Sequence, residues 1–387
     1  MPKIPKVILL IDTARSYGRG LLEGIAKYSN LHGPWIFYWK APFYRESGGR
    51  ELSLPRLRGL NADGIIMREQ KKTREILTLG LPTIISPYKN QFPGLPNIVT
   101  DDVTMGKMAA EHLLSRGFQH FAYCGFKDMF GVRSRGESFC RCVAKAGFRA
   151  SVYKEPKSRI KQLWTNEQNV MAEWLKSLPK PVGLMACNDD RARHVTEACK
   201  IAGLHVPEEV AIIGVDNDEL VCNLSSPPLS SIVLNFERAG YEAAELLDKL
   251  MAGKKRLSKS ITVSPMHTIT RQSTDILATE DIEVAGAIRY IRQNVNRAIQ
   301  VDDVVNVVTV SRRGLERRFR NVLNRSVLDE IKRVRIDLVA KMLVETNLSV
   351  SQIALKLGYS GAENIARYFR QEKGISPIVY REKYGRR

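Results

Sequence analysis

The chain lacks the long apolar segments that would hold it in a membrane or direct it across one. No apolar run among its 387 residues approaches the roughly 20 residues that span a bilayer. The start at Met1–Val7 and the apolar run after it are too short for a signal peptide, because Asp12 and Arg15 interrupt them. We therefore expect a cytoplasmic protein with no membrane partner.

Motifs for catalysis and metal binding are also missing. The six cysteines form no CxxC pair, which argues against a zinc site and favours buried, reduced thiols. There is no GxSxG, no P-loop, no HExxH and no glycine-rich dinucleotide fingerprint after the first apolar run. Adjacent side chains tend to point apart, so the aspartate pairs at 101–102 and 189–190 make no acid–base couple by themselves. These absences predict a protein that is not an enzyme and that uses neither a metal nor a cofactor.

Positive charge is what the sequence has in excess. The formal net charge is +19, which points to a polyanionic partner. Residues 277–387 carry 21 Lys and Arg against 13 Asp and Glu, a net of +8, so the excess is only modestly denser there. Basicity alone is therefore weak support for nucleic-acid binding, and the geometry of the arginines has to decide.

The carboxy-terminal hundred residues contain one pattern twice. In 301–323 and again in 350–373, a short apolar helix and a turn precede a helix that carries arginines. On a helical wheel of ~100° per residue, Arg313, Arg317 and Arg320 fall together on one face. The apolar residues of the same helix fall on the opposite face, and the second copy repeats the arrangement. Each copy therefore predicts a helix-turn-helix unit with an apolar and a basic face.

Two such units favour DNA as the partner. A single basic stripe is more often a solvated helix face, but two stripes in the same context favour recognition helices. Between them, Val327–Glu345 predicts a long helix. Its expected buried side consists of Ile331, Val334, Leu338 and Met342. Two recognition helices held on one rigid helix can enter successive major grooves about 34 Å apart.

The first 275 residues alternate short apolar runs with amphipathic stretches. This alternation predicts parallel βαβ units in an open doubly wound sheet, and the length favours two lobes. Ligands of such sheets bind where loops leave the carboxyl ends of the strands. The polar residues expected there are Asp12, Arg15, Tyr17, Asp101, Arg135, Asn188, Asp189 and Asp216. Carboxylates, guanidinium groups and an amide can pair with the hydroxyls of a sugar, although some of these residues can instead cap the helices that follow.

An ordered series of motifs runs through the same part of the chain. The motifs are Ile98–Gly106, Ala110–Gly117, Val206-Pro207, Ile213–Asp216, Leu229–Ser231 and Arg271–Asp275. Over residues 5–275 they resemble the sensor domains of the LacI/GalR family, which implies a two-lobed type I periplasmic-binding-protein fold. The resemblance implies effector contacts from Asp101, Arg135, Asn188 and Asp216. In that family a DNA-binding headpiece precedes the first strand. Only about six residues do so here, so DNA reading is expected elsewhere in the chain.

The closing segments Ser349–Ser360 and Tyr368–Arg381 resemble the AraC/XylS family, and the resemblance covers residues 282–384. In the first copy, Thr309 stands where a turn glycine is frequent, and Asn324 stands where the second copy has Gly374. The matching positions imply base contacts from Arg313, Glu316 and Arg317, and from Ala362, Glu363, Asn364, Ala366 and Arg367. Arg312 and Arg320 complete the expected DNA-binding set.

Together these patterns predict an α/β two-lobed sensor (1–275), a linker (276–281) and an all-α double helix-turn-helix domain (282–387). The segments Asp190–His194, Gly214–Leu220 and Arg271–Asp275 narrow the resemblance to regulators of xylose operons, so D-xylose is the first candidate effector. We expect a regulator, most simply an activator, that works as a homodimer with operator DNA and RNA polymerase. A sugar-processing enzyme with a basic docking tail, or the same regulator with another small-molecule effector, is left open.

Overall fold

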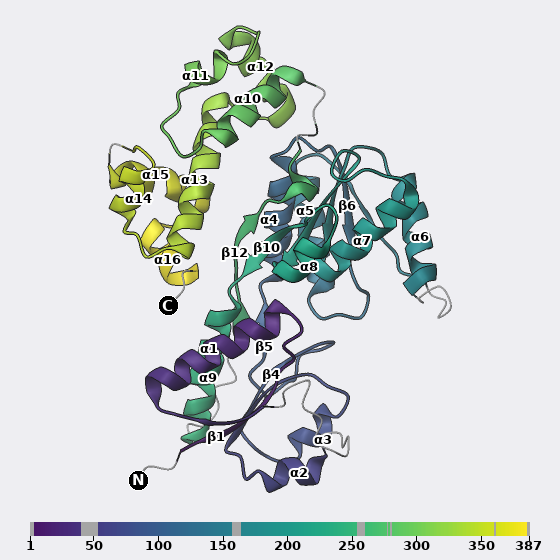
Figure 1. The fold of residues 1–387 in the computed structure, drawn as a ribbon, viewed down its shortest axis with the longest axis vertical. Coiled ribbons are helices and arrows are strands. Elements are labelled where there is room, and N and C mark those ends of the chain that lie inside the picture. Colours follow the sequence, from purple (N-terminus) through teal and green to yellow (C-terminus); the bar gives the residue numbers. More distant parts are fainter. Residues whose placement is uncertain are drawn as a thin grey trace. The chain divides into compact units, whose positions relative to one another are not determined.

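The computed structural model describes residues 4–39, 53–156, 164–253, 260–276, 278, 281–359 and 361–384 (Figure 1). The chain divides into two compact units. The first unit, called here the first lobe, comprises Met1–Asp102, Lys127–Arg133 and Asn235–Ser264. The second unit contains Val103–Phe126, Ser134–Leu234 and Pro265–Arg387, which form the second lobe and the helical carboxy-terminal domain.

The first lobe is built on a parallel four-stranded sheet in the order β2-β1-β3-β4. Its strands are β1 (Lys6–Leu10), β2 (Ile36–Trp39), β3 (Gly64–Arg68) and β4 (Thr83–Ser86). A second small sheet pairs β5 (Ile98–Thr100) with β11 (Ile261–Val263). The helices are α1 (Ser16–His32), α2 (Leu54–Gly59), α3 (Thr73–Leu77) and α9 (Phe236–Met251). The apolar runs of β1, β3 and β4 are buried, as expected for parallel strands covered on both faces.

Helices α1 and α9 pack unusually closely, because glycines stand at their contact. A Cβ atom at Gly24 would lie 1.9 Å from the carbonyl oxygen of Glu237, and one at Gly240 would lie 2.1 Å from that of Leu21. Neither position can accept a side chain unless the helices move apart. The close approach joins the amino-terminal helix to a helix more than 200 positions later in the chain.

The second lobe holds a six-stranded sheet in the order β12-β10-β9-β8-β6-β7. Its strands are β6 (His120–Cys124), β7 (Ala150–Val152), β8 (Val182–Ala186), β9 (Val210–Asp216), β10 (Ser230–Leu234) and β12 (Pro265–Ile269). All neighbours are parallel except β10 and β12. The helices are α4 (Asp102–Leu114), α5 (Val132–Lys145), α6 (Trp164–Ser177), α7 (Asp189–Ala202) and α8 (Glu219–Leu224). The predicted two-lobed, doubly wound α/β architecture is confirmed.

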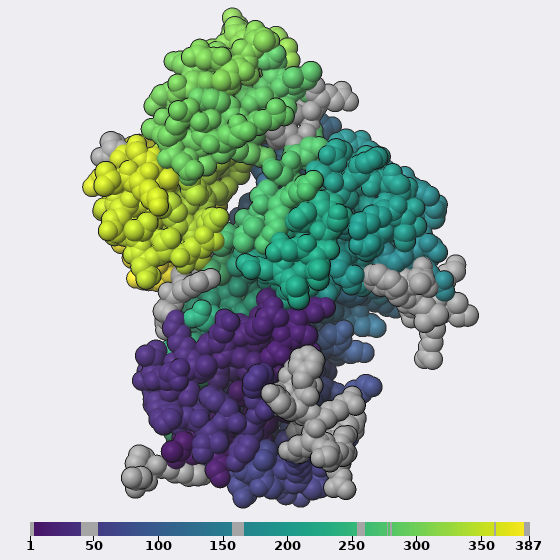
Figure 2. Space-filling view, viewed as in Figure 1, coloured from purple at the N-terminus to yellow at the C-terminus, as the bar shows by residue number. Residues whose placement is uncertain are grey.

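The carboxy-terminal domain is entirely helical within its described residues. Its helices are α10 (Ile282–Gln293), α11 (Val301–Val305), α12 (Arg312–Leu323), α13 (Val327–Glu345), α14 (Val350–Lys356), α15 (Ala362–Lys373) and α16 (Pro377–Tyr384). The first helix-turn-helix unit (α11 and α12) and the second (α14 and α15) have separate apolar cores, centred on Phe319 and Phe369. Figure 2 shows the first helix-turn-helix unit in green and the second helix-turn-helix unit in yellow. The predicted double helix-turn-helix domain is therefore confirmed.

The buried side of α13 differs from the prediction. Ile331 is buried, but Val334, Leu338 and Met342 are only partly buried. The fully buried residues are Val327, Glu330, Ile331, Arg335, Ile336, Val339, Ala340, Leu343 and Val344. The first half of α13 packs into the core of the first helix-turn-helix unit, and its second half packs into the core of the second helix-turn-helix unit. The buried face therefore rotates along the helix. A single helical stripe cannot describe a helix that serves two cores.

The helical domain contacts strand β12 of the second lobe. The Tyr380 hydroxyl donates to the carbonyl oxygen of Met266 at 2.7 Å, and Met266 is part of the core of the second helix-turn-helix unit. An ion pair of 3.8 Å joins Arg292 of α10 to Asp275. The predicted linker at 276–281 stays a prediction, because residues 277, 279 and 280 lie outside the described residues.

Two further expectations concern cysteines and membranes. All six cysteines are unpaired. Four are buried, whereas Cys140 and Cys142 are only half-buried, so the expectation of buried thiols is wrong for these two. Within the described ranges, every helix is too short or too polar to traverse a bilayer.

Candidate DNA interface and effector site

Helix α12 separates an apolar face from a basic face, as its sequence pattern predicts. Leu315, Phe319 and Leu323 are buried in the first core. The helix begins after Ser311, whose hydroxyl accepts a hydrogen bond from the backbone N–H of Gly314 at 3.3 Å. This cap satisfies one of the N–H groups left unpaired at a helix start and fixes where the basic face begins.

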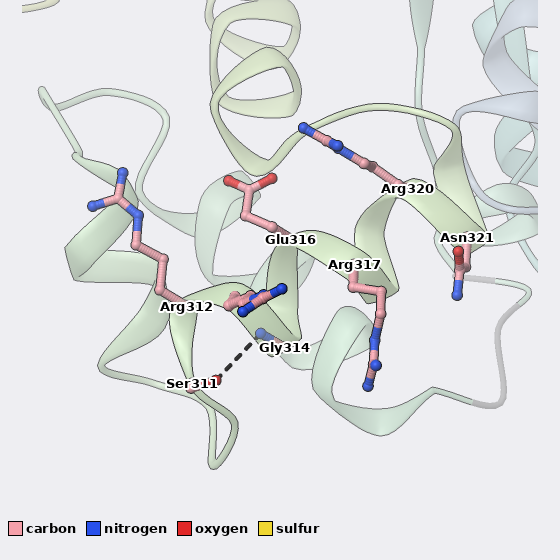
Figure 3. A pocket seen from close by; sticks show the side chains of 8 residues that line it. Ser311, Arg312, Gly314, Glu316, Arg317, Arg320 and Asn321 are labelled. Carbon is pink, nitrogen blue, oxygen red and sulfur yellow. Dashed lines mark hydrogen bonds between the residues drawn. The ribbon is translucent and has the colours of Figure 1, made fainter.

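Three exposed arginines, Arg313, Arg317 and Arg320, line an open groove along α12 (Figure 3). Figure 3 shows the side chains of Arg317 and Glu316 extending to opposite sides of the helix. None of the three arginines has a hydrogen-bond or ion-pair partner in the part of the chain that the structure describes. Unpaired guanidinium groups on a helix face suit a polyanion, and each can donate two parallel hydrogen bonds to a guanine edge.

Two other residues of the expected set already have protein partners. Arg312 pairs with Asp302 of α11 at 3.0 Å, and both side chains are more than half exposed. Such an exposed pair contributes little and can be exchanged for a phosphate contact. The Glu316 carboxylate accepts a hydrogen bond of 3.4 Å from the backbone N–H of Val327, at the start of α13. Glu316 therefore also stabilises the beginning of the connecting helix.

Helix α15 repeats the arrangement with fewer charges. Ile365 and Phe369 are buried in the second core, and Glu363, Arg367 and Arg370 are exposed. The remaining expected contact residues, Ala362, Asn364 and Ala366, are half-buried. Arg367 differs from the three unpaired arginines of α12 because its guanidinium donates a hydrogen bond to the hydroxyl of the next residue, Tyr368, at 3.0 Å.

The two units end their recognition helices in the same way despite different residues. Asn324 has a φ of 52° and Gly374 a φ of 76°, and each residue donates its backbone N–H to the arginine carbonyl four positions earlier. Asparagine is the residue other than glycine that most readily takes this left-handed conformation.

The turn within the first helix-turn-helix unit is held by a side chain from α10. The backbone N–H of Thr309 donates to the Glu283 carboxylate at 2.8 Å. Sequence reasoning missed Glu283, because its partner lies 26 positions away.

In the second lobe, Asn188 and Asp216 lie at the carboxyl ends of neighbouring strands, Asn188 two residues after β8 and Asp216 at the last position of β9. Met185 of β8 pairs with Ile213 of β9, and each of the two polar residues comes three positions later, at the carboxyl edge of the sheet. Asp216 has a φ of 100°, which a residue with a side chain rarely adopts. Such a conformation costs on the order of 1–3 kcal/mol and occurs most often at ligand-binding positions. Asn188 caps α7 through its side-chain oxygen, which accepts from the Arg191 N–H at 2.9 Å.

Arg135 reaches the same edge from α5. Its side chain is buried and donates to the backbone carbonyl of Cys187, immediately before Asn188. Burial raises the pKa of the Cys187 thiol to about 11, an effect that Arg135 opposes and Asp216 strengthens. Arg135, Asn188 and Asp216 are therefore brought together at one edge of the sheet.

Each carboxylate oxygen of Asp189 accepts a hydrogen bond from within its own lobe. Its carboxylate accepts hydrogen bonds from the Ser231 hydroxyl at 2.6 Å and from the backbone N–H of Asp218 at 2.8 Å. Ser231 in turn accepts from the backbone N–H of Asn217 at 3.0 Å. Burial, and then the charge of Asp216, raise the pKa of Asp189 well above its ordinary value. Asp189 thus holds the turn that carries Asp216, and a direct role in ligand binding stays a prediction.

The expected effector residues of the first lobe are more exposed. The Tyr17 hydroxyl lies 2.5 Å from the Ser86 hydroxyl, and its ring lies edge-on to Phe236. Asp12 accepts from the backbone N–H of Ala14, and Arg15 directly precedes α1. Asp101 follows β5, and its backbone N–H donates to the Val263 carbonyl. The effector contacts expected of these four residues stay predictions. Within the described ranges, no cluster of three metal-binding side chains occurs.

Comparisons with known proteins cover both parts of the chain. Residues 110–274 match a periplasmic binding protein-like domain, and residues 304–383 match a helix-turn-helix domain. The chain is 32% identical to the xylose operon regulatory protein of Haemophilus influenzae, over 97% of this chain and 98% of that protein. The chain belongs to this family. It is 28% identical to the Escherichia coli K12 protein of the same name, over 97% of each chain. The solved structure of the xylose-binding transcription activator xylR covers all of both chains, with 26% identity and a TM-score of 0.60.

Family membership settles the class of the protein. The chain is a DNA-binding transcription regulator in which a periplasmic-binding-protein-like sensor precedes a helix-turn-helix domain. The regulator carries its DNA-binding helices at the carboxy-terminal end, as the repeated arginine helices indicate.

Proposed function

We propose that this regulator responds to D-xylose and activates a sugar-catabolic operon. One observation carries the proposal: sensor and helix-turn-helix domain together are similar, over nearly the whole chain, to proteins named for the regulation of xylose operons. A structural neighbour with 26% identity is titled a xylose-binding transcription activator. The regulator works in the cytoplasm and is not an enzyme, in keeping with relatives that are named as regulators.

The second lobe supplies groups suited to sugar hydroxyls. Asp216 accepts hydrogen bonds, Arg135 donates them, and Asn188 donates through its amide nitrogen because its oxygen caps α7. A hydroxyl needs both a donor and an acceptor around it when it is buried. These three residues therefore bind the sugar, and Asp12, Arg15, Tyr17 and Asp101 provide the remaining contacts. Asp189 acts through the turn that carries Asp216.

The two recognition helices bind double-stranded DNA. Arg313 and Arg317 of α12 and Arg367 of α15 contact base edges, with Arg312 and Arg320 close to the phosphates. Glu316, Ala362, Glu363, Asn364 and Ala366 complete the surface that faces the bases. Each protomer reads one half-site through two grooves, so the active form is a homodimer. Sugar binding changes how the two protomers present these helices, which then recruit RNA polymerase.

Calorimetry with the full chain tests the effector. D-xylose is titrated, with L-arabinose, D-ribose and D-glucose as comparisons, into the wild-type protein and an Asp216→Ala variant. A hydrogen bond to a charged group contributes about 1.5–3 kcal/mol, so Asp216→Ala weakens binding by roughly 12- to 140-fold. Glu197→Ala removes a partly exposed carboxylate of α7 that pairs with Lys200, and it leaves binding unchanged. Binding heat on titration with another sugar, and none with D-xylose, would show that the other sugar is the effector. Turnover of any bound sugar would contradict the proposal that the protein is a regulator and not an enzyme.

A further inference from the structure

The ring of Tyr368, on α15, is approached by cations from two helices of the DNA-binding domain. The guanidinium carbon of Arg367 is 4.8 Å from the centre of the Tyr368 ring, and its Nη2 atom donates to the Tyr368 hydroxyl at 3.0 Å. The ammonium nitrogen of Lys332, on α13, lies 5.0 Å from the centre of the same ring. Both distances are within the range of cation–π attraction. Tyr368 therefore links Arg367 of the second recognition helix to the connecting helix.

A second pair of the same kind fixes the turn before α15. Arg335, one helical turn after Lys332 on α13, places its guanidinium carbon 4.1 Å from the centre of the Tyr359 ring. Its side chain is buried and donates to the backbone carbonyl of Leu357. The connecting helix thus holds the second unit at two tyrosines, one in the turn and one on the recognition helix.

Three arginines of the first recognition helix have no comparable restraint. Arg313, Arg317 and Arg320 are exposed and have no side-chain partner among the described residues. A free arginine loses conformational entropy when it is ordered against a base, and that loss weakens discrimination. An arginine that is already held by a ring and a hydroxyl loses less. Arg367 is therefore better ordered before DNA arrives than these three arginines of the first unit.

We propose that Tyr368 is a positioning residue for sequence recognition: it orients Arg367 so that its guanidinium meets a guanine edge in the major groove. Within the second unit, sequence recognition then depends on an arginine that is ordered before DNA arrives, whereas Arg313, Arg317 and Arg320 of the first unit become ordered only on binding. The inference rests on the DNA-binding function and names, within it, the residue that orients the reader.

The test uses the full-length protein and a duplex that the protein itself selects from a randomised library, compared with a scrambled duplex of equal length. Tyr368→Phe keeps the ring and removes the hydroxyl. It lowers affinity for the selected duplex roughly three- to tenfold, the usual range for one lost hydrogen bond. Affinity for the scrambled duplex and its salt dependence stay unchanged. Tyr359→Phe is the matched control, because no side-chain hydrogen bond of Tyr359 occurs among the described residues. It changes neither affinity.

A double-mutant cycle separates positioning from a structural role. In an Arg367→Ala background, Tyr368→Phe has no further effect on affinity for the selected duplex, because Tyr368 acts only through Arg367. A persisting effect, an equal loss on both duplexes, or tighter binding by Tyr368→Phe would each overturn the proposal. If the wild-type protein enriches no sequence from the library, the DNA-reading function fails first, and that outcome is distinguishable from failure of the Tyr368 proposal.

Discussion

Two adjacent arginines of α12 give the sharpest test of the DNA interface. Arg317 is exposed and has no partner among the described residues, so its removal disturbs nothing within the protein. Arg318 faces α10 instead and pairs with Asp281 at 2.9 Å. Both changes to alanine remove one positive charge from neighbouring positions. Any difference between them therefore reports where the side chain points and not the net charge.

The magnitudes follow from these surroundings. A bidentate contact between arginine and guanine provides about 1–3 kcal/mol of discrimination, so Arg317→Ala weakens specific DNA binding by roughly 5- to 140-fold. Arg318→Ala leaves DNA affinity within about twofold of wild type. It lowers the unfolding free energy by less than about 1 kcal/mol, because the pair is partly exposed and Asp281 still caps α10 through the N–H groups of Glu283 and Val284.

Fluorescence anisotropy with labelled duplex measures both affinities, and calorimetry with D-xylose checks that the sensor is intact. Neither variant changes sugar affinity. Equal losses of DNA affinity for Arg317→Ala and Arg318→Ala would refute the assignment of α12's exposed face as the reading surface. A parallel loss of sugar affinity would show that Arg317 supports the fold instead.

Three further outcomes are expected. Phe319→Ala and Phe369→Ala each empty the centre of one helix-turn-helix core and lower the unfolding free energy by about 3–5 kcal/mol in chemical denaturation; a loss below about 1 kcal/mol would contradict the assigned cores. Glu330 is fully buried and pairs with Arg325 and Arg333. Burial raises its pKa, but the two arginines outweigh burial and hold that pKa below its ordinary 4.5. Its stabilisation is therefore complete above about pH 4.5 and is lost as the pH falls through the lowered pKa, so Glu330→Gln flattens the acid part of the stability profile; an unaltered profile would exclude this role. Asp189→Ala weakens D-xylose binding indirectly by freeing the turn of Asp216, whereas Asp189→Asn retains it; equal loss in both variants would point to direct contact by the charge.

Sequence reasoning worked best where a pattern is local. The faces of α12 and α15 follow from helical periodicity alone, because each helix packs against a single core. It failed on α13, whose buried face rotates between two cores, and periodicity cannot report which partner a helix meets at each turn. Contacts across long separations were also invisible. Glu283 with Thr309, and Lys332 with Tyr368, become neighbours only when the helices pack.

The effector residues show the same limit. The rule that polar residues follow strands placed Asn188 and Asp216 at one edge of the second lobe. It also selected Asp189, whose carboxylate is engaged by Ser231 and Asp218, since the rule cannot separate a side chain that faces a ligand from one that holds the neighbouring turn. The strained φ of Asp216 distinguishes it, but backbone strain at a residue other than glycine leaves no mark in the sequence.

A footprint on DNA upstream of the genes for xylose use, in the genome that encodes this chain, tests the central claim most directly. The account predicts that D-xylose strengthens the protection of two half-sites. Within each half-site, the protected segments lie in two successive major grooves, about one helical turn apart. Arg317→Ala and Arg367→Ala each weaken that protection. Protection that is identical with and without any sugar, or no protection at all, would contradict a sensor that controls two DNA-reading helices.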